Sequence, residues 1–264
     1  MKKTLAHRKL VLSCFVLLLI LNNRALANYG QSKQTPPALK SILNMQTLSA
    51  CRIRHYNVEY EVKDGEKTVG DAKRVLSSID GVTSLHSRVD ASIAFLKFSQ
   101  TEESILTNYQ SKGLVPEQYT QVKKKPFKKA KTTSFSILQT NTVDDELSVS
   151  VFDPLTVYDH LRELVCLGLR DDVELTVQDG KNTEQFQLSF KGQETLLLPI
   201  GNVEVLLMVR TRKTNSRETS IWFDVNRQFL PVKIEQAKDG DKQATLVASS
   251  VKVDKYVIYG IEEK

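Results

Sequence analysis

The stretch YNVEYEVKDG, residues 56–65, decides the fold. Its apolar residues, Tyr56, Val58, Tyr60 and Val62, alternate with polar ones. A period of two places all four side chains on one face of a β-strand and leaves the other face to water. The dipeptide Asp64-Gly65 follows, and it tolerates the positive φ angles of a tight hairpin turn. The stretch therefore predicts a strand that leads into a hairpin.

The same alternation recurs along the chain. It appears at Val173/Leu175/Val177, Phe186/Leu188/Phe190, Val203/Val205/Leu207/Val209 and Ile221/Phe223/Val225, and Asp-Gly recurs at 80–81, 179–180 and 239–240. Residues 99–113 fit both a helix and a strand, and we favour the strand. The pattern predicts a mainly β fold: a curved antiparallel sheet, half-barrel or barrel-like, with one or two short helices packed on it. We expect one such domain over residues 54–264, after an extension over 28–53 that contains a short helix.

One helix is marked clearly within the β pattern. Asp153 is a suitable N-cap, Pro154 fits the first helical position, and Gly168 fits the residue just past the end. The apolar residues between them share one face, which we expect to pack on the sheet. Cys166 lies almost opposite that face.

The first 27 residues have the features of an export signal. Basic residues precede an apolar run from Leu10 to Leu21, which is too short to span a bilayer, and Ala25-Leu26-Ala27 is a small-x-small cleavage pattern. Cleavage after Ala27 predicts a periplasmic protein with no membrane span. In the alternative, Cys14 in a lipoprotein-like box is the lipidated residue and anchors the chain; an uncleaved signal anchor is a third interpretation.

This leader also carries the excess of positive charge. The whole chain has a net charge of +6 from 37 basic and 31 acidic residues, but five basic residues and no acidic ones lie within residues 1–27. The remainder has 32 basic residues against 31 acidic ones. This near-balance argues against nucleic acid as a partner.

Cys51 and Cys166 are the two cysteines that follow the leader. In an oxidising compartment they permit one disulfide, and two unrelated buried thiols are the alternative.

The segment KKKPFKKAK, residues 123–131, is the most basic part of the chain. Its lysines are Lys123, Lys124, Lys125, Lys128, Lys129 and Lys131. They form a surface basic patch that is either a binding site for phosphate headgroups or a solvated hairpin that protects a sheet edge.

Catalytic and cofactor motifs are absent from the sequence. His160 follows Asp159, but adjacent helical residues point about 100° apart, so the carboxylate is poorly placed to orient the imidazole. We find no nucleophile elbow, no glycine-rich phosphate loop, no C-x-x-C pair and no zinc-helix spacing of histidines. The sequence predicts no metal, no cofactor and no enzymatic activity.

Several strands are apolar on both faces, most clearly around Trp222 in the segment SIWFDV, residues 220–225. Ordinary packing on both sides explains this, and so does a cavity. If a cavity exists, we expect it to be lined by Phe95, Leu206, Met208 and Trp222, with a volume of about 300 to 1,000 Å³.

Taken together, the segments resemble the exported bacterial family DUF3108, a family of unknown function. The likeness covers roughly residues 54–251 and is carried by YNVEYEV, KTVGDA, FLKFSQTEES, GLVPEQY, FDPLTVYDHLR, VQDGKNTEQF, GQETLLLPIG and RETSIWFDVNRQFLPVKIEQAKDG. It implies a periplasmic, mostly β protein with no established activity. It also suggests an analogy with the half-open barrels of Lol-type lipoprotein carriers, which concerns the fold only.

Three functions follow as hypotheses. The first is an envelope protein that binds or carries an apolar ligand such as a lipid. The second is an envelope adaptor that holds a protein or polysaccharide through its surface. The third is a hydrolase whose carboxylates, such as Asp159, Glu163 and Glu218, meet only in space.

Overall fold

The structure is a computed structural model, and it describes residues 51, 53, 55–106, 115–137, 151–212 and 215–254. The cleavage site after Ala27, Cys14 and the predicted N-terminal helix lie outside the described residues.

The described residues contain thirteen strands and the helix α4. The strands are β1 Tyr56–Asp64, β2 Lys67–Ile79, β3 Val82–Ile93, β4 Leu96–Leu106, β5 Pro116–Lys124, β6 Lys131–Ser136, β7 Val151–Phe152, β8 Val173–Asp179, β9 Asn182–Leu198, β10 Gly201–Arg212, β11 Asn215–Asp224, β12 Pro231–Lys238 and β13 Asp241–Val253. α4 spans Thr156–Cys166, between β7 and β8. The described part of the ambiguous segment, 99–106, lies in β4 and is a strand as predicted.

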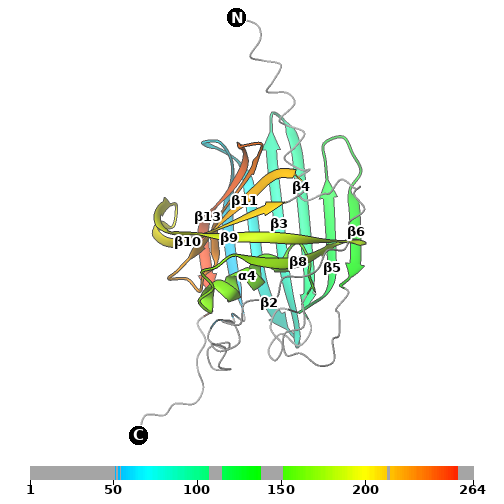
Figure 1. The fold of residues 1–264 in the computed structure, drawn as a ribbon. Coiled ribbons are helices and arrows are strands. Elements are labelled where there is room, and N and C mark those ends of the chain that lie inside the picture. Colours follow the sequence, from blue (N-terminus) through cyan, green and yellow to red (C-terminus); the bar gives the residue numbers. More distant parts are fainter. Residues whose placement is uncertain are drawn as a thin grey trace, which may run out of the picture.

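All thirteen strands belong to one sheet, in the order β6-β5-β4-β3-β2-β1-β13-β12-β11-β10-β9-β8-β7. Neighbours are antiparallel except β7 and β8, which are parallel and joined through α4. The sheet curls without closing into a barrel, so that β8, β9 and β10 run across the upright strands β2 to β5 (Figure 1). The Gln178 amide of β8 donates to the Ser136 carbonyl of β6 at 3.0 Å, which links the two ends of the sheet. The predicted curved, half-barrel sheet is confirmed.

The Asp-Gly dipeptides lie at hairpins, as predicted. Asp80 and Gly81 are the two central residues of the β2–β3 turn, and both have positive φ (50° and 80°). Asp239 and Gly240 occupy the same positions between β12 and β13. The left-handed conformation matches the twist of the strands on either side.

The predicted end signal at Gly168 is confirmed, whereas the helix starts at Thr156 with Leu155 as its N-cap, so the prediction of Pro154 as the first helical residue is wrong. The Asp153 carboxylate accepts hydrogen bonds from the backbone N–H groups of Leu155 and Thr156 at 2.7 and 2.8 Å, although helical geometry starts two residues later than Pro154. At the other end Gly168 has φ +100°, and the N–H of Leu169 donates to the Leu164 carbonyl. These bonds satisfy backbone groups that a helix leaves open at its ends.

We call the side of the sheet that contacts α4 the inner face. α4 packs there on an apolar cluster from β8 to β11: Leu175, Val177, Phe186, Leu188, Leu206, Met208, Ile221 and Phe223. The helix is also buried on its opposite side, where Asp159 and Arg162 are almost inaccessible to solvent. The curled sheet therefore encloses the helix instead of carrying it on an open surface.

Gly70 of β2 lies in the same strand phase as the buried Ala72 and Arg74, and its backbone is close to that of β3. A Cβ atom at this position would lie 1.9 Å from the backbone oxygen of Asp90 in β3, which cannot move without breaking the strand pair.

We expect Gly70→Ala to lower the free energy of unfolding by about 3 kcal/mol, the upper part of the range for overpacking. Urea unfolding measures this effect. Asp71→Ala, the exposed neighbour, is the matched control and should change stability by less than about 0.5 kcal/mol. Equal midpoints for the two variants would contradict the clash.

Candidate functional site

A pocket of about 150 Å³ lies on the inner face, beside the start of α4. Its walls come from β2, β3 and β4 on one side, β12 and β13 on the other, and the residues that lead into α4. The lining residues are Arg74, Ser87, Val89, Ala91, Phe98, Ser99, Gln100, Glu102, Pro154, Leu155, Tyr158, Ile234, Gln236, Ala244 and Leu246. The pocket is smaller than the range expected from the sequence.

Strand register explains why these residues meet. Ala91 pairs with Phe98, Val89 with Gln100, and Ser87 with Glu102, and paired residues project from the same face. Ala91 and Phe98 lie near the β3–β4 turn, whereas Ser87 and Glu102 lie further down the sheet. The pocket therefore extends along the strands, from the end with the β3–β4 turn to the start of α4.

The pocket residue Arg74 forms a buried ion pair at the end of the pocket beside α4. Arg74 of β2 pairs with Asp159 of α4, and its guanidinium also donates to the Leu155 carbonyl at 2.7 Å. Tyr56 of β1 donates to Asp159 Oδ1 at 2.7 Å. Burial lowers the pKa of Arg74, but the Asp159 carboxylate outweighs it, and the net pKa lies well above its ordinary value. This ion pair fixes the helix to β1 and β2.

A second polar group lies beside the pocket on β4 and β5. The Glu102 carboxylate accepts hydrogen bonds from Tyr119 and, at 3.0 Å, from Gln121. Ser104 donates to the capping carboxylate of Asp153 at 2.8 Å. Burial raises the pKa of Asp153 to about 6. These contacts hold the start of α4 against the strands that line the pocket.

Lys123 does not belong to the surface basic patch, which corrects the sequence prediction. It is 3% exposed, because it projects from the inner face of β5 and pairs with the pocket residue Gln100 across the sheet. The ammonium of Lys123 and the amide nitrogen of Gln100 are buried without a hydrogen-bond acceptor. Burial lowers the pKa of Lys123 to about 8. The pocket wall thus contains one unused donor, on Gln100, and a second lies beside it on Lys123 of the next strand.

The other lysines of the run remain near the surface. Lys124, Lys128, Lys129 and Lys131 are exposed, and Lys125 is half-buried. They surround Phe127, which is also exposed, in the loop between β5 and β6.

None of the four predicted lining residues contacts the pocket. Phe95 is fully exposed at the β3–β4 turn. Leu206 and Met208 face inward, but they pack in the cluster under α4. Trp222 projects from the outer face, where the Lys233 ammonium lies 4.2 Å from its ring centre and its indole N–H donates to Glu194 at 2.6 Å.

The residues considered for catalysis do not form a common site. Asp159 is held by Arg74, and the ring of His160 stacks on Phe152 at 4.2 Å between centroids. Burial lowers the pKa of His160 to about 4, which keeps the ring neutral at pH 7. Glu218 lies exposed on β11, away from the buried helix. In the parts of the chain that the structure describes, no group of acidic, histidine and cysteine side chains is arranged to hold a metal ion.

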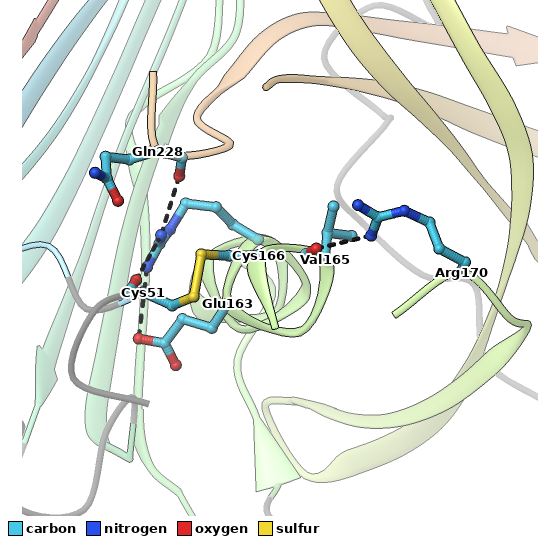
Figure 2. The surroundings of a disulfide bond; sticks show 7 residues. Cys51, Glu163, Val165, Cys166, Arg170 and Gln228 are labelled. Atoms are coloured by element: carbon cyan, nitrogen blue, oxygen red, sulfur yellow. Dashed lines mark hydrogen bonds and ion pairs between the residues drawn. A yellow bond between two sulfur atoms is a disulfide. The ribbon is translucent and has the colours of Figure 1, made fainter. Parts of the chain in front are cut away.

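A disulfide joins Cys166 at the end of α4 to Cys51, with 5.8 Å between their Cα atoms (Figure 2). Beside it, Arg162 donates to the carbonyl oxygens of Cys51 at 2.9 Å and Gln228 at 3.1 Å. The segment before β1, the helix and the β11–β12 loop therefore meet at one point.

Within the described ranges, no helix is both long and apolar enough to cross a membrane.

Comparison with known families gives a match over most of the chain. The model of a family described as protein of unknown function, DUF3108, matches residues 55–247, which include most of the sheet and all of the pocket lining. No curated protein matches the sequence.

Solved structures of similar shape are distant in sequence. A β-barrel-like protein of the DUF1849 family from Brucella abortus is 9% identical over 77% of this chain and all of its own length, with a TM-score of 0.49. A suspected lipoprotein from Parabacteroides distasonis is 7% identical over 75% of this chain and 95% of its own, with a TM-score of 0.30. A suspected exported protein with a YmcC-like fold from Bacteroides fragilis is 12% identical over 75% of this chain and 96% of its own, with a TM-score of 0.32.

Proposed function

The chain belongs to the DUF3108 family of proteins of unknown function, and we propose that it is a non-enzymatic periplasmic protein that binds one slender apolar ligand, such as an acyl chain, in the pocket beside α4. The observation that carries the proposal is the pocket itself. It lies on the face of the sheet that contacts α4, and much of its lining is apolar.

The size of the pocket limits the ligand. An apolar cavity of about 150 Å³ admits a group the size of benzene. The volume here is about 150 Å³, so the pocket suits a short chain or the end of a longer one and not a whole bilayer lipid. Val89, Ala91, Phe98, Ile234 and Leu246 supply its apolar walls.

The ligand we propose also has a polar head. Gln100 lies in the pocket wall, and Lys123 is its partner on the next strand, about 5 Å away between Cβ atoms. A buried donor without an acceptor is costly, and a carboxylate or hydroxyl oxygen would remove that cost. Medium-chain fatty acids and alcohols fit this description.

Ala244 offers a way to test the pocket without disturbing the core. Its side chain lines the pocket and is only half-buried, so a larger side chain can fill the space. We expect Ala244→Phe to weaken the binding of decanoic acid and decanol at least tenfold, measured by isothermal titration calorimetry. Thr245→Phe is the matched control, because successive side chains of a strand point to opposite faces.

The expected control result is unchanged binding in Thr245→Phe. If neither compound binds the unmodified protein, or if both variants bind it equally well, the proposed pocket function is wrong. Trp222 is not a suitable reporter for this titration, because it lies on the outer face.

A further inference from the structure

Two phenylalanines protrude from hairpin tips. Phe95 lies at the β3–β4 turn and is 100% exposed, and Phe127 lies in the β5–β6 loop and is 97% exposed. Large aromatic side chains usually bury most of their surface. Full exposure of both is therefore unexplained by packing.

The backbone at both positions is unfavourable for these residue types. Ala94 and Phe95 form the centre of the β3–β4 turn with φ of 48° and 71°, and Phe127 has φ 59°. Turns of this type usually contain Asn, Asp or Gly. A bulky residue in the left-handed region is an outlier, and such outliers concentrate at functional sites.

The two tips lie at the same end of the sheet. Strands β3 to β6 run alternately up and down, so the β3–β4 and β5–β6 connections share one end, at the top of the view (Figure 1). The register of β4 and β5 pairs Ser99 with Lys124, which places the tips at a similar height. Two strand spacings, about 10 Å, separate the hairpins.

Positive charge accompanies both aromatic rings. Residues 93–97 and 124–131 contain six lysines and no acidic residue. The lysines are Lys97, Lys124, Lys125, Lys128, Lys129 and Lys131. We call Phe95, Phe127 and these lysines the tip surface. Aromatic residues beside lysines are the composition of segments that lie at anionic membrane surfaces.

We propose that the tip surface docks on an anionic lipid bilayer, with Phe95 and Phe127 entering the interface and the lysines contacting headgroup phosphates. The pocket residues Ala91 and Phe98 lie within a few residues of the same β3–β4 turn, so docking brings this end of the pocket to the lipid. Both rings are free in the folded protein, so no unfolding is needed for insertion.

Vesicle co-sedimentation tests this proposal with the purified protein. We expect binding to vesicles of phosphatidylglycerol and phosphatidylcholine, and at least tenfold weaker binding to phosphatidylcholine alone. The double variant Phe95→Ser/Phe127→Ser should lose at least tenfold in affinity for the anionic vesicles. Its thermal unfolding should match the unmodified protein, because both side chains are exposed.

Leu197→Ser is the matched control. Leu197 is 82% exposed near the β9–β10 turn, outside the tip surface, and its replacement should leave vesicle binding unchanged. Equal loss in this variant, no loss in the phenylalanine variant, or no binding by the unmodified protein would overturn the proposal. If the tips bind a protein partner instead of lipid, the unmodified protein will not bind the vesicles. Ligand binding by calorimetry is measured without vesicles, so the test of the pocket function is independent of the vesicle result.

Discussion

Replacing Asp159 with Asn is expected to lower the free energy of unfolding by about 3–5 kcal/mol, because the substitution leaves the buried Arg74 guanidinium without its counter-charge. Arg74 remains charged even without this carboxylate, because a guanidinium group is effectively always protonated in proteins. Tyr56 also loses its carboxylate acceptor, although the new amide oxygen can replace it. The midpoint of urea unfolding measures the loss.

A double variant distinguishes the cost of an unpaired buried charge from the cost of any change at this position of the helix. In Arg74→Met/Asp159→Leu both charges are replaced by apolar groups, and removal of a whole buried pair is often neutral or stabilising. We expect the double variant to recover most of the stability that Asp159→Asn loses. An equally large loss in the double variant would show that the pair's hydrogen bonds, and not the unpaired charge, determine the effect.

Removal of the disulfide is expected to have an effect of similar size. Cys51 and Cys166 are 115 residues apart, and closing a loop of that length restricts the unfolded chain strongly. In the chain-entropy account a loop of about 100 residues corresponds to about 4.7 kcal/mol, and measured losses are typically about 2–5 kcal/mol. We expect Cys51→Ala/Cys166→Ala to fall in this range.

Reductant provides the control for that variant. Dithiothreitol should lower the unfolding midpoint of the unmodified protein toward that of Cys51→Ala/Cys166→Ala, and it should leave the variant unchanged. Two free thiols in the protein isolated from its native compartment would contradict the disulfide. They would also remove a reason for placing the chain in an oxidising compartment.

Local patterns in the sequence were sufficient to predict most of the fold. The alternation at Tyr56 to Val62 defines β1, and Asp-Gly dipeptides mark its hairpin and three others. Asp153 and Gly168 mark α4 to within a few residues. Each of these signals depends on neighbours in the sequence, so no knowledge of strand pairing was required.

The pocket could not be predicted in the same way, because it depends on strand register. Both faces of β11 are apolar, and nothing local shows that Ile221 faces the helix while Trp222 faces outward. The sequence of β2 nevertheless contained an indication of the pocket wall. Arg74 falls in the apolar phase of β2 between Ala72 and Leu76, where a charged residue indicates a buried polar contact.

Lys123 illustrates the same limit. It is the first of six lysines in the run, which suggested a shared surface. The pairing of Lys123 with Gln100 instead turns it inward, while Lys124 next to it turns outward. Composition predicted the charge of the segment, but only the alternation of β5, combined with its partner strand, assigns a face to each lysine.

Native mass spectrometry of the protein isolated from its native compartment tests the central claim most directly. The account predicts a population with an added mass that corresponds to one small acyl compound, which is reduced or absent in Ala244→Phe and retained in Thr245→Phe. A single ligand-free mass for all three proteins, under conditions that preserve known lipid complexes, would contradict it.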